Sequence, residues 1–191
     1  MLLTNNIAII ADDLTGANDT ALQFMMRGCN TQILFDYQAV PEGKSYTQAW
    51  AISTETRNED PDYAARKVYE ITQGLLFNFN FEHVYKKIDS TLRGNIAHEC
   101  WATMKALDYD AAVIVPAFPA ENRTTIGGYQ MLKGVPVERT EFARDPQNPI
   151  FESHIPTLLR QQVKEENYDD IDLIQFSTVT KGAGPILVEL Q

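Results

Sequence analysis

A short apolar run that changes into adjacent acidic residues and then into a helical pattern constrains this fold more than any other feature. Residues 7–11 (IAIIA) predict a buried strand, Asp12 and Asp13 follow directly, and a helical pattern begins at Ala17. Ligands of open α/β sheets bind outside the carboxyl ends of the strands, so two carboxylates at such an end predict a binding site. The alternative is that Asp12 or Asp13 caps the helix, with Thr15 as the nearer N-cap candidate.

The same alternation of apolar runs and helical patterns continues along the chain and predicts an α/β fold. Five further strands are expected, at residues 31–35, 48–53, 82–88, 111–115 and 171–176. Helices are expected from residue 17 to a stop at 27–30, over 60–77, from 95 to about 107, from 153 or 154 to about 166, and from 182 onward. In the first helix, Ala21, Leu22, Met25 and Met26 can share one face. We therefore expect a mostly parallel sheet with helices on both faces.

The alternation breaks at residues 121–149, which contain too much glycine, proline and charge for a helix. Residues 129–133 and 135–140 are expected to form two strands around Gly134. We interpret this part as a β-hairpin excursion near 121–150, beside the sheet ends.

Composition argues against several classes of protein. The 191 residues include 16 basic and 26 acidic side chains, a formal net charge of −10, whereas a nucleic-acid-binding protein would present a basic stripe. No apolar run approaches the roughly 20 residues of a membrane helix, and no secretory signal is recognisable, so we expect a cytoplasmic protein. Cys29 and Cys100 lack metal-ligand spacing and the three histidines are scattered, so no metal site is expected.

A second acidic turn follows the strand expected at residues 82–88. Asp89, Ser90, Thr91 and Arg93 offer a carboxylate, two hydroxyls and a guanidinium within five residues, directly before a helix. These groups can bind an anion together with the free N–H groups of the helix start. The alternative is a helix cap with a surface arginine. Lys86 and Lys87 alternate faces on a strand, so at most one of them is expected to point into a site.

Two further polar stretches follow predicted strands. Residues 54–57 (TETR) are a second candidate wall of the site, and residues 122–128 combine Arg123, Thr124 and Thr125 with two glycines. The second stretch could bring backbone donors close to an anion, or it could be an exposed turn. Asp145 is expected to be a turn residue. Acids and anion-binding donors at one sheet edge predict a polyhydroxy acid as ligand, with an aspartate acting as a base on one hydroxyl.

Several motifs, in order along the chain, resemble those of the four-carbon acid sugar kinases. Residues 11–19 (ADDLTGAND) resemble the ADDxTGAxD signature of that family, and residues 87–94 (KIDSTLRG) resemble its KxDSTLRG motif. Residues 116–119, 123–125, 134–136 and 140–146 follow in the family's order. The resemblance covers the chain from about residue 7 to residue 153.

The resemblance implies a two-domain ATP-dependent kinase for acids such as threonate, erythronate or 3-oxo-tetronate. The N-terminal domain of such kinases binds the sugar acid, and the C-terminal domain binds the nucleotide. Residues 1–191 would then be the sugar-acid-binding domain, which we expect to be truncated because the last helical pattern stops scarcely a turn or two in. No P-loop or glycine-rich nucleotide motif is recognisable, so ATP and Mg²⁺ would be bound mainly by the missing domain.

The resemblance also implies roles for single residues. Arg93, with Ser90 and Lys87, would hold the carboxylate of the substrate. Asp12, Asp13 and Asp89 would bind its hydroxyls, one of them orienting the hydroxyl that attacks the phosphoryl group. Arg123 would reach that phosphoryl group. The remaining substrate-binding candidates are Thr15, Gly16, Gly94 and Thr124.

Two other functions are alternatives to a kinase. A phosphatase of the haloacid dehalogenase type has an acidic loop with aspartates two residues apart, whereas Asp12 and Asp13 are adjacent. A non-catalytic module that binds sugar acids is the second alternative. The expected partner is a small sugar acid, and neither nucleic acid nor a membrane is expected. A homo-oligomer is left open.

Overall fold

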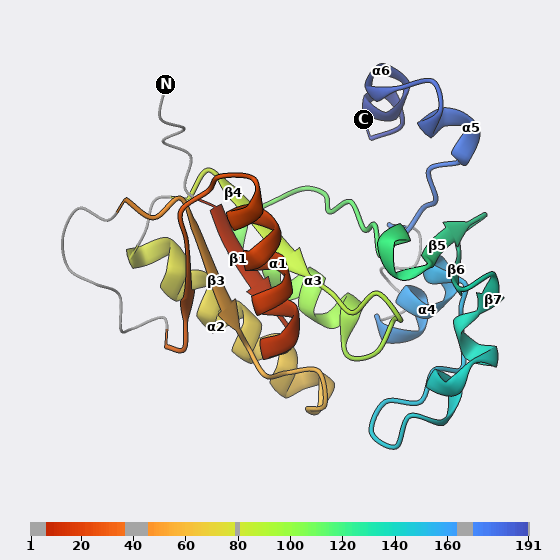
Figure 1. The fold of residues 1–191 in the computed structure, drawn as a ribbon, viewed down its shortest axis with the longest axis horizontal. Helices are drawn as coiled ribbons and strands as arrows, with labels where there is room; N and C mark the ends of the chain where they lie inside the picture. Colours follow the sequence, from red (N-terminus) through yellow and green to blue (C-terminus); the bar gives the residue numbers. More distant parts are fainter. Residues whose placement is uncertain (1–6, 37–45, 79–80, 164–169, 191) are drawn as a thin grey trace. The chain divides into compact units, whose positions relative to one another are not determined.

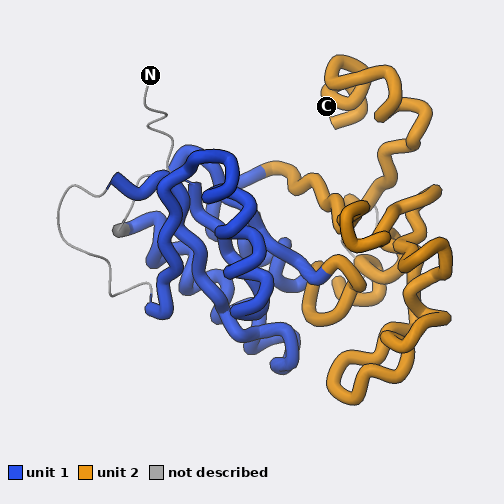
Figure 2. The backbone as a smooth tube through the Cα atoms, in the orientation of Figure 1, with its two compact units in different colours: residues 1–89, 98–109 blue, residues 90–97, 110–191 orange. Residues whose placement is uncertain are grey.

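The computed structural model describes residues 7–36, 46–78, 81–163 and 170–190. The chain forms two compact units, shown in different colours in Figure 2. Unit 1 comprises residues 1–89 and 98–109, and unit 2 comprises residues 90–97 and 110–191. Every helix among the described residues is too short or too polar to cross a membrane.

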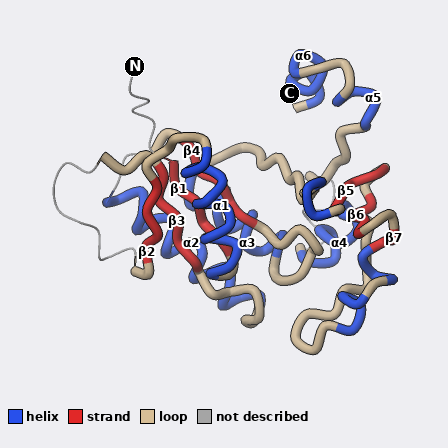
Figure 3. The backbone as a smooth tube through the Cα atoms, viewed as in Figure 1, coloured by secondary structure: helices blue, strands red, loops and turns tan. Residues whose placement is uncertain are grey.

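Unit 1 contains a parallel four-stranded sheet with the strand order β2-β3-β1-β4 (Figures 1 and 3). Its elements are β1 (Ile7–Ala11), α1 (Leu14–Met26), β2 (Thr31–Leu34), β3 (Ala49–Ser53), α2 (Pro61–Asn78), β4 (His83–Lys87) and α3 (Ile96–Leu107). The first two residues of α3 belong to unit 2. All four strands and all three helices lie where the sequence pattern predicts them. The carboxyl ends of β1, β3 and β4 lie at the same edge of the sheet because the strands are parallel and in register from residues 7, 49 and 83.

Helices cover both faces of this sheet, as predicted. Alternate residues of β1 point to opposite faces. Ile9 packs in one apolar cluster with Ala17 and Ala21 of α1, whereas Ile10 packs in another with Ile71 and Leu75 of α2. The sheet is therefore buried on both sides, which is why its strands read as nearly continuous apolar runs.

The face of α1 that packs on the sheet is not the one formed by the four apolar residues singled out in the sequence. Leu22, Met25 and Met26 are 44%, 56% and 71% exposed, and Ala21 alone of the four predicted residues is buried. The residues of α1 that pack on the sheet are small: Gly16, Ala17, Thr20 and Ala21. Small side chains let the helix approach the sheet closely. The size of the residues therefore determines which face of α1 packs on the sheet more than their hydrophobicity does. The helix stops as predicted, because Gly28 adopts a positive φ of 88° and the N–H of Cys29 returns to the carbonyl of Phe24.

The described residues of unit 2 form a small antiparallel sheet with the order β5-β6-β7 and three short helices. Its elements are β5 (Arg123–Ile126), β6 (Tyr129–Leu132), β7 (Val135–Pro136), α4 (Ile155–Gln162), α5 (Phe176–Val179) and α6 (Ala183–Glu189), with short 3₁₀ helices at Pro119–Glu121, Val137–Arg139 and Glu141–Arg144. The predicted hairpin around Gly134 is confirmed, and residues 123–126 add a strand that was not predicted. β7 is shorter than predicted because Pro136 has no N–H to continue the ladder, and a 3₁₀ helix follows it.

Two predicted strands are wrong. Residues 111–115 and 171–175 have neither helix nor strand structure, and residue 176 begins α5. A strand requires a neighbour to complete its ladder, and no described residue pairs with either segment. Val113 and Val115 are accordingly 61% and 70% exposed. The helix predicted from residue 153 or 154 has His154 as its N-cap, but it ends at Gln162, and the predicted end at residue 166 lies outside the described residues.

Candidate functional site

The acidic turn after β1 places its two adjacent carboxylates in different surroundings. Asp12 is 3% exposed, whereas the side chain of Asp13 is 24% exposed. Asp13 is also the N-cap of α1, because its Oδ1 accepts a hydrogen bond from the N–H of Gly16 at 2.7 Å. Thr15 lies exposed in the first turn and is not the cap. The turn therefore combines a helix cap with two acidic groups.

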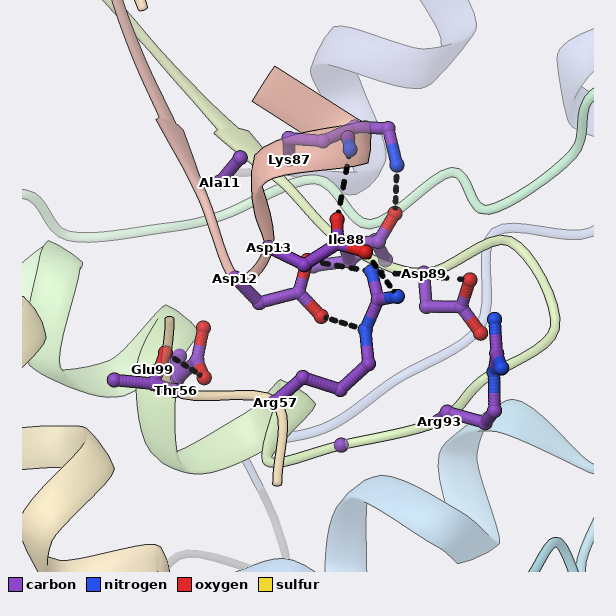
Figure 4. Close-up of polar contacts among 12 residues, drawn as sticks. Ala11, Asp12, Asp13, Thr56, Arg57, Lys87, Ile88, Asp89, Arg93 and Glu99 are labelled. Atoms are coloured by element: carbon purple, nitrogen blue, oxygen red, sulfur yellow. Dashed lines mark hydrogen bonds and ion pairs between the residues drawn. The ribbon is translucent and has the colours of Figure 1, made fainter. Parts of the chain in front are cut away.

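Arg57, in the loop after β3, connects the two acids (Figure 4). Its Nε donates to Oδ2 of Asp12 at 2.7 Å, and its Nη2 donates to Oδ1 of the same carboxylate at 3.0 Å. Its Nη1 donates to Oδ2 of Asp13 at 2.5 Å. The N–H groups of Thr56 and Arg57 also donate to the backbone carbonyl of Asp12, at 3.0 and 3.3 Å. The loop after β3 is thus held against the loop after β1 by both backbone and side-chain contacts.

Asp89, two residues after the last residue of β4, is the third carboxylate of the group. It is buried, and its Oδ1 lies 4.0 Å from Nη2 of Arg57. Burial alone would lower the pKa of Arg57, but the hydrogen bond and charge of Asp12, together with the charges of Asp89 and Asp13, raise it above its ordinary value. Arg57 is therefore a permanent cation among three carboxylates.

Lys87 is the second cation of this group. It pairs with Ala11 in the sheet register and so faces the same side as α1, whereas Lys86 faces the opposite side. The Nζ of Lys87 donates to the carbonyl of Ile88 at 2.6 Å. Burial lowers the pKa of Lys87, and the charges of Asp12 and Asp89 offset this effect only in part.

Gly16 provides the space in which Asp13 and Lys87 meet the start of α1. A Cβ atom at this position would lie 2.7 Å from Oδ1 of Asp13 and 3.3 Å from Cγ of Lys87. The group as a whole holds three carboxylates against two cations. It therefore suits the hydroxyl groups of a ligand, which donate to carboxylates, better than a ligand carboxylate.

In unit 2, Ser90 is held by two side chains of the small sheet. Nη1 of Arg123 donates to the Ser90 hydroxyl at 2.7 Å, and Nε2 of Gln130 donates to the Ser90 carbonyl at 2.7 Å. The Nε of Arg123 is buried and has no hydrogen-bond partner among the described residues. An unpartnered buried N–H of a cation is costly, so it favours binding of an anion or a hydroxyl oxygen there.

Arg93 is placed by an ion pair and an aromatic ring, both in unit 2. Its Nη1 lies 3.2 Å from Oδ2 of Asp145, and its guanidinium lies 5.0 Å from the centre of the Phe142 ring. Asp145 also accepts hydrogen bonds from the N–H groups of Gln147 and Asn148, at 3.0 and 2.8 Å. The turn predicted at Asp145 is confirmed, and this residue additionally orients Arg93.

The loop that carries Ser90 and Arg93 has a strained backbone. Leu92 adopts a φ of 69°, which is unfavourable for a residue with a large side chain, and Gly94 adopts a φ of 89°. Burial of the Leu92 side chain, which is 1% exposed, holds this conformation. The carbonyl of Gly94 accepts a hydrogen bond from Nε2 of Gln162 at 3.0 Å. Strain of this kind is often found where side chains are aimed at a ligand.

Comparison with known protein families identifies the chain. The family described as the sugar-binding N-terminal domain matches residues 7–191. The chain belongs to this family. Relatives with named activities are kinases of four-carbon acid sugars, as the resemblance in the motifs implied.

A D-threonate kinase of Salmonella typhimurium is 39% identical to this sugar-binding domain over 84% of the chain. A D-erythronate kinase of Heliobacterium modesticaldum is 35% identical over 97% of it. The chain spans only 38% and 42% of the length of these two kinases. A Bordetella bronchiseptica structure, described as a domain of unknown function with bound citrate in a domain-swapped dimer, superposes with a TM-score of 0.76 and 40% identity. It covers 80% of this chain, which spans 39% of that protein.

The predicted site residues of the sugar-binding domain fall into two groups. In unit 1 they are Asp12, Asp13, Lys87 and Asp89, whose charges act on or respond to Arg57, and Gly16, which adjoins Asp13 and Lys87. In unit 2, Ser90 contacts Arg123, whereas Arg93 contacts Asp145. Thr15 is exposed on α1, and Thr124 pairs with Met131 in the small sheet. The roles of all these residues in binding or catalysis stay predictions.

Sequence reasoning missed Arg57 and Gln130 as members of these groups. The stretch of residues 54–57 was singled out as a wall of the site, so a signal for Arg57 existed. Its partners Asp12 and Asp13 lie 45 and 44 residues away in the sequence, and no local pattern shows such a pairing. Gln130 is fully buried in β6 and gave no sequence signal.

The described residues do not fit a metal ion. They contain no group of three His, Cys, Asp or Glu side chains arranged as ligands. Both oxygens of Asp12 and both oxygens of Asp13 already accept hydrogen bonds from Arg57 or Gly16. The carboxylates of Asp12 and Asp13 are therefore not arranged as Mg²⁺ ligands.

Proposed function

We propose that this domain binds the sugar acid in an ATP-dependent kinase that phosphorylates a hydroxyl of a four-carbon acid of the threonate, erythronate or 3-oxo-tetronate type. The observation that carries the proposal is the group of Asp12, Asp13 and Asp89 around Arg57 at the carboxyl ends of parallel strands. Membership of the sugar-binding family and the activities named for its kinase relatives support it. The citrate bound by the Bordetella protein, a hydroxy acid, is consistent with this class of ligand.

The geometry suggests different roles for the two adjacent aspartates. Both oxygens of Asp12 are engaged by one guanidinium, which suits an acid that holds Arg57 in place. Asp13 is more exposed, and each of its oxygens has a lone pair beyond its one hydrogen bond. We therefore infer that Asp13, with Asp89, accepts hydrogen bonds from substrate hydroxyls. One of them orients the attacking hydroxyl and takes its proton.

The carboxylate of the sugar acid is assigned to the residues that follow Asp89 in the sequence. Arg93 supplies a guanidinium oriented by Asp145, and Ser90 supplies a hydroxyl. Lys87 is added to them only on the resemblance in the motifs. Arg123, whose Nε is buried and unpartnered among the described residues, is assigned to the transferred phosphoryl group. Catalysis would rest mainly on positioning and on stabilisation of charge.

ATP would supply the phosphoryl group, and the proposal places its binding, with Mg²⁺, outside residues 1–191. This chain would then be inactive alone. The sequence-based expectation of a cytoplasmic location stays a prediction. Homo-oligomer formation is also part of the proposal, because the related Bordetella protein is described as a domain-swapped dimer.

Thermal unfolding of the chain with threonate, erythronate and related four-carbon acids tests the proposal. A ligand at a hundred times its dissociation constant should add about 2.7 kcal/mol to the free energy of unfolding. A hexonate and uncharged sugars are the controls and should give no shift. If no four-carbon acid shifts the transition, the assignment of the sugar-acid site to this chain is wrong.

A second assay separates the kinase from the alternatives. A protein that also carries the nucleotide-binding domain should transfer phosphate from ATP to the acid that stabilises this chain. Hydrolysis of simple phosphate esters with Mg²⁺ would indicate a phosphatase instead. Tight binding of the acid without phosphate transfer would indicate a non-catalytic binding module.

A further inference from the structure

A buried ion pair lies on the opposite face of the sheet from Lys87. The Nζ of Lys86 in β4 is 2.7 Å from Oε2 of Glu99 in α3, and their side chains are 9% and 2% exposed. Burial alone would lower the pKa of Lys86, but the charge of Glu99, followed by that of Asp12, raises it. Lys86 is therefore a cation, and the contact is too enclosed for either group to meet a substrate.

Glu99 extends this pair into a chain of hydrogen bonds that ends beside the acidic turn. Its second oxygen, Oε1, accepts a hydrogen bond from the hydroxyl of Thr56 at 2.6 Å (Figure 4). The Thr56 hydroxyl lies 2.6 Å from that of Thr54. Because a carboxylate only accepts, Thr56 donates to Glu99. The single hydroxyl hydrogen of Thr54 is shared between two acceptors, the Thr56 oxygen and the carbonyl of Ala11, which lies 3.0 Å away. Both threonines are fully buried, so these hydrogen bonds form away from water.

The two threonines also hold the ends of the neighbouring strands. The N–H of Thr54 donates to the carbonyl of Ala11 at 2.8 Å, and the N–H of Thr56 donates to the carbonyl of Asp12 at 3.0 Å. The next residue is Arg57, whose guanidinium binds Asp12 and Asp13. Glu99 thus fixes the residue that immediately precedes the cation of the acidic group.

Stability alone does not explain a buried pair of this kind. Removing two charges from water is costly, and apolar side chains of similar volume often stabilise a fold equally well or better. Glu99 lies in the first turn of α3, where the helix dipole favours its negative charge. What an apolar replacement could not supply is the acceptor for Thr56.

We propose that Glu99 is a positioning residue for sugar-acid binding. It holds Thr56, and through Thr56 it fixes the orientation of the Arg57 guanidinium, which in turn holds the carboxylates of Asp12 and Asp13. Lys86 keeps the Glu99 carboxylate in place and compensates its charge. The inference rests on the proposed function for its ligand. The link from Glu99 to Arg57 can be measured without any ligand.

Two double variants isolate the hydrogen bond from the charge. K86M/E99Q and K86M/E99M both remove the ion pair and leave no unpaired buried charge. K86M/E99Q keeps an oxygen that can accept from Thr56, whereas K86M/E99M does not. We expect K86M/E99M to bind the four-carbon acid about tenfold more weakly than K86M/E99Q, which is the upper end of the effect of losing one hydrogen bond between uncharged groups.

A single substitution tests the same link if a double variant fails to fold. Thr56→Val keeps the size of the side chain and removes its hydroxyl. The matched control is Thr72→Val, because Thr72 is also buried and its hydroxyl bonds only within α2, to the carbonyl of Val68 at 2.7 Å. Thr56→Val should weaken acid binding about tenfold, and Thr72→Val should leave it unchanged.

The measurement without ligand is the rate at which the Arg57 Nε–H exchanges with water, followed by NMR. The hydrogen bond to Asp12 should slow this exchange. Thr56→Val and K86M/E99M should speed this exchange, while K86M/E99Q and Thr72→Val should not. Unchanged exchange in folded Thr56→Val protein would overturn the proposal. If exchange changes as expected but the parent chain binds no four-carbon acid, the positioning of Arg57 stands and the proposed function fails.

Discussion

The guanidinium of Arg57 meets the carboxylate of Asp12 edge to edge, with Nε 2.7 Å from Oδ2 and Nη2 3.0 Å from Oδ1. Only a planar fork of donors can make this bidentate contact and still reach Asp13 with its third nitrogen. The positions of the Asp12 and Asp13 carboxylates therefore depend on the shape of the Arg57 side chain as well as on its charge.

Arg57→Lys should separate shape from charge. Lysine keeps the cation but cannot bind both oxygens of Asp12 in the same plane, so we expect binding of four-carbon acids to fall by about tenfold or more. Isothermal calorimetry on the purified chain measures this. Arg27→Lys, at the exposed end of α1, is the control and should bind normally. Equal affinity in both variants would refute the role of the Arg57 fork.

Asp13 should show two separable effects, because it caps α1 and faces solvent more than Asp12 does. Asp13→Ala should lower the free energy of unfolding by about 1 kcal/mol through loss of the cap. Asp13→Asn keeps an oxygen for the N–H of Gly16 and should retain most of that stability. Both variants should lose acid binding, as measured by thermal shift. Normal binding by Asp13→Asn would show that its charge is not needed.

Gly16→Ala should destabilise the chain although alanine is normally better than glycine in a helix by about 1 kcal/mol. The reason is the Cβ atom, which would lie 2.7 Å from Oδ1 of Asp13 and so displace the cap. Gly184→Ala is the matched control, because a Cβ there meets nothing within 4 Å. Urea unfolding should show a loss for the first variant and none for the second. A gain in stability for Gly16→Ala would mean that the Asp13 cap moves at no cost.

Asp145 should make the stability of the fold depend on acidic pH. Hydrogen bonds from the N–H groups of Asn148 and Gln147, and then Arg93, lower the pKa of Asp145 below its ordinary value of 3.8. The unfolded chain therefore binds a proton more readily than the folded chain does. The stabilisation by Asp145 is complete above its unfolded pKa and is lost as pH falls through its lower folded pKa.

Urea unfolding of the parent chain and of Asp145→Asn tests this direction of the pH dependence. The free energy of unfolding is measured from pH 6 down to pH values below the ordinary pKa of an aspartate. The parent should be the more stable of the two at pH 6, and the difference should shrink as the pH falls. Arg93→Gln should retain most of the dependence, because the backbone donors remain. A difference that grows with acidity would contradict the assignment.

The sequence predicts the parts of this molecule that local pattern determines. The strands β1 to β4 and the polar residues that follow them were predicted because each strand is a short apolar run ended by polar side chains. The pairing of Arg57 with Asp12 was not, because it joins loops 45 residues apart. Residues 111–115 show the opposite error: their apolar, β-branched character predicts a strand, but a strand also needs a neighbour, which is a property of the tertiary structure.

The boundary between the two units passes between Asp89 and Ser90, inside a single motif, and the chain crosses between units again at residues 97–98 and 109–110. Neither unit is therefore a continuous stretch of the gene. A single recombination event cannot exchange one unit for that of a relative without breaking the other. Variation between members of this family should therefore accumulate by point substitution within each unit and not by exchange of whole units.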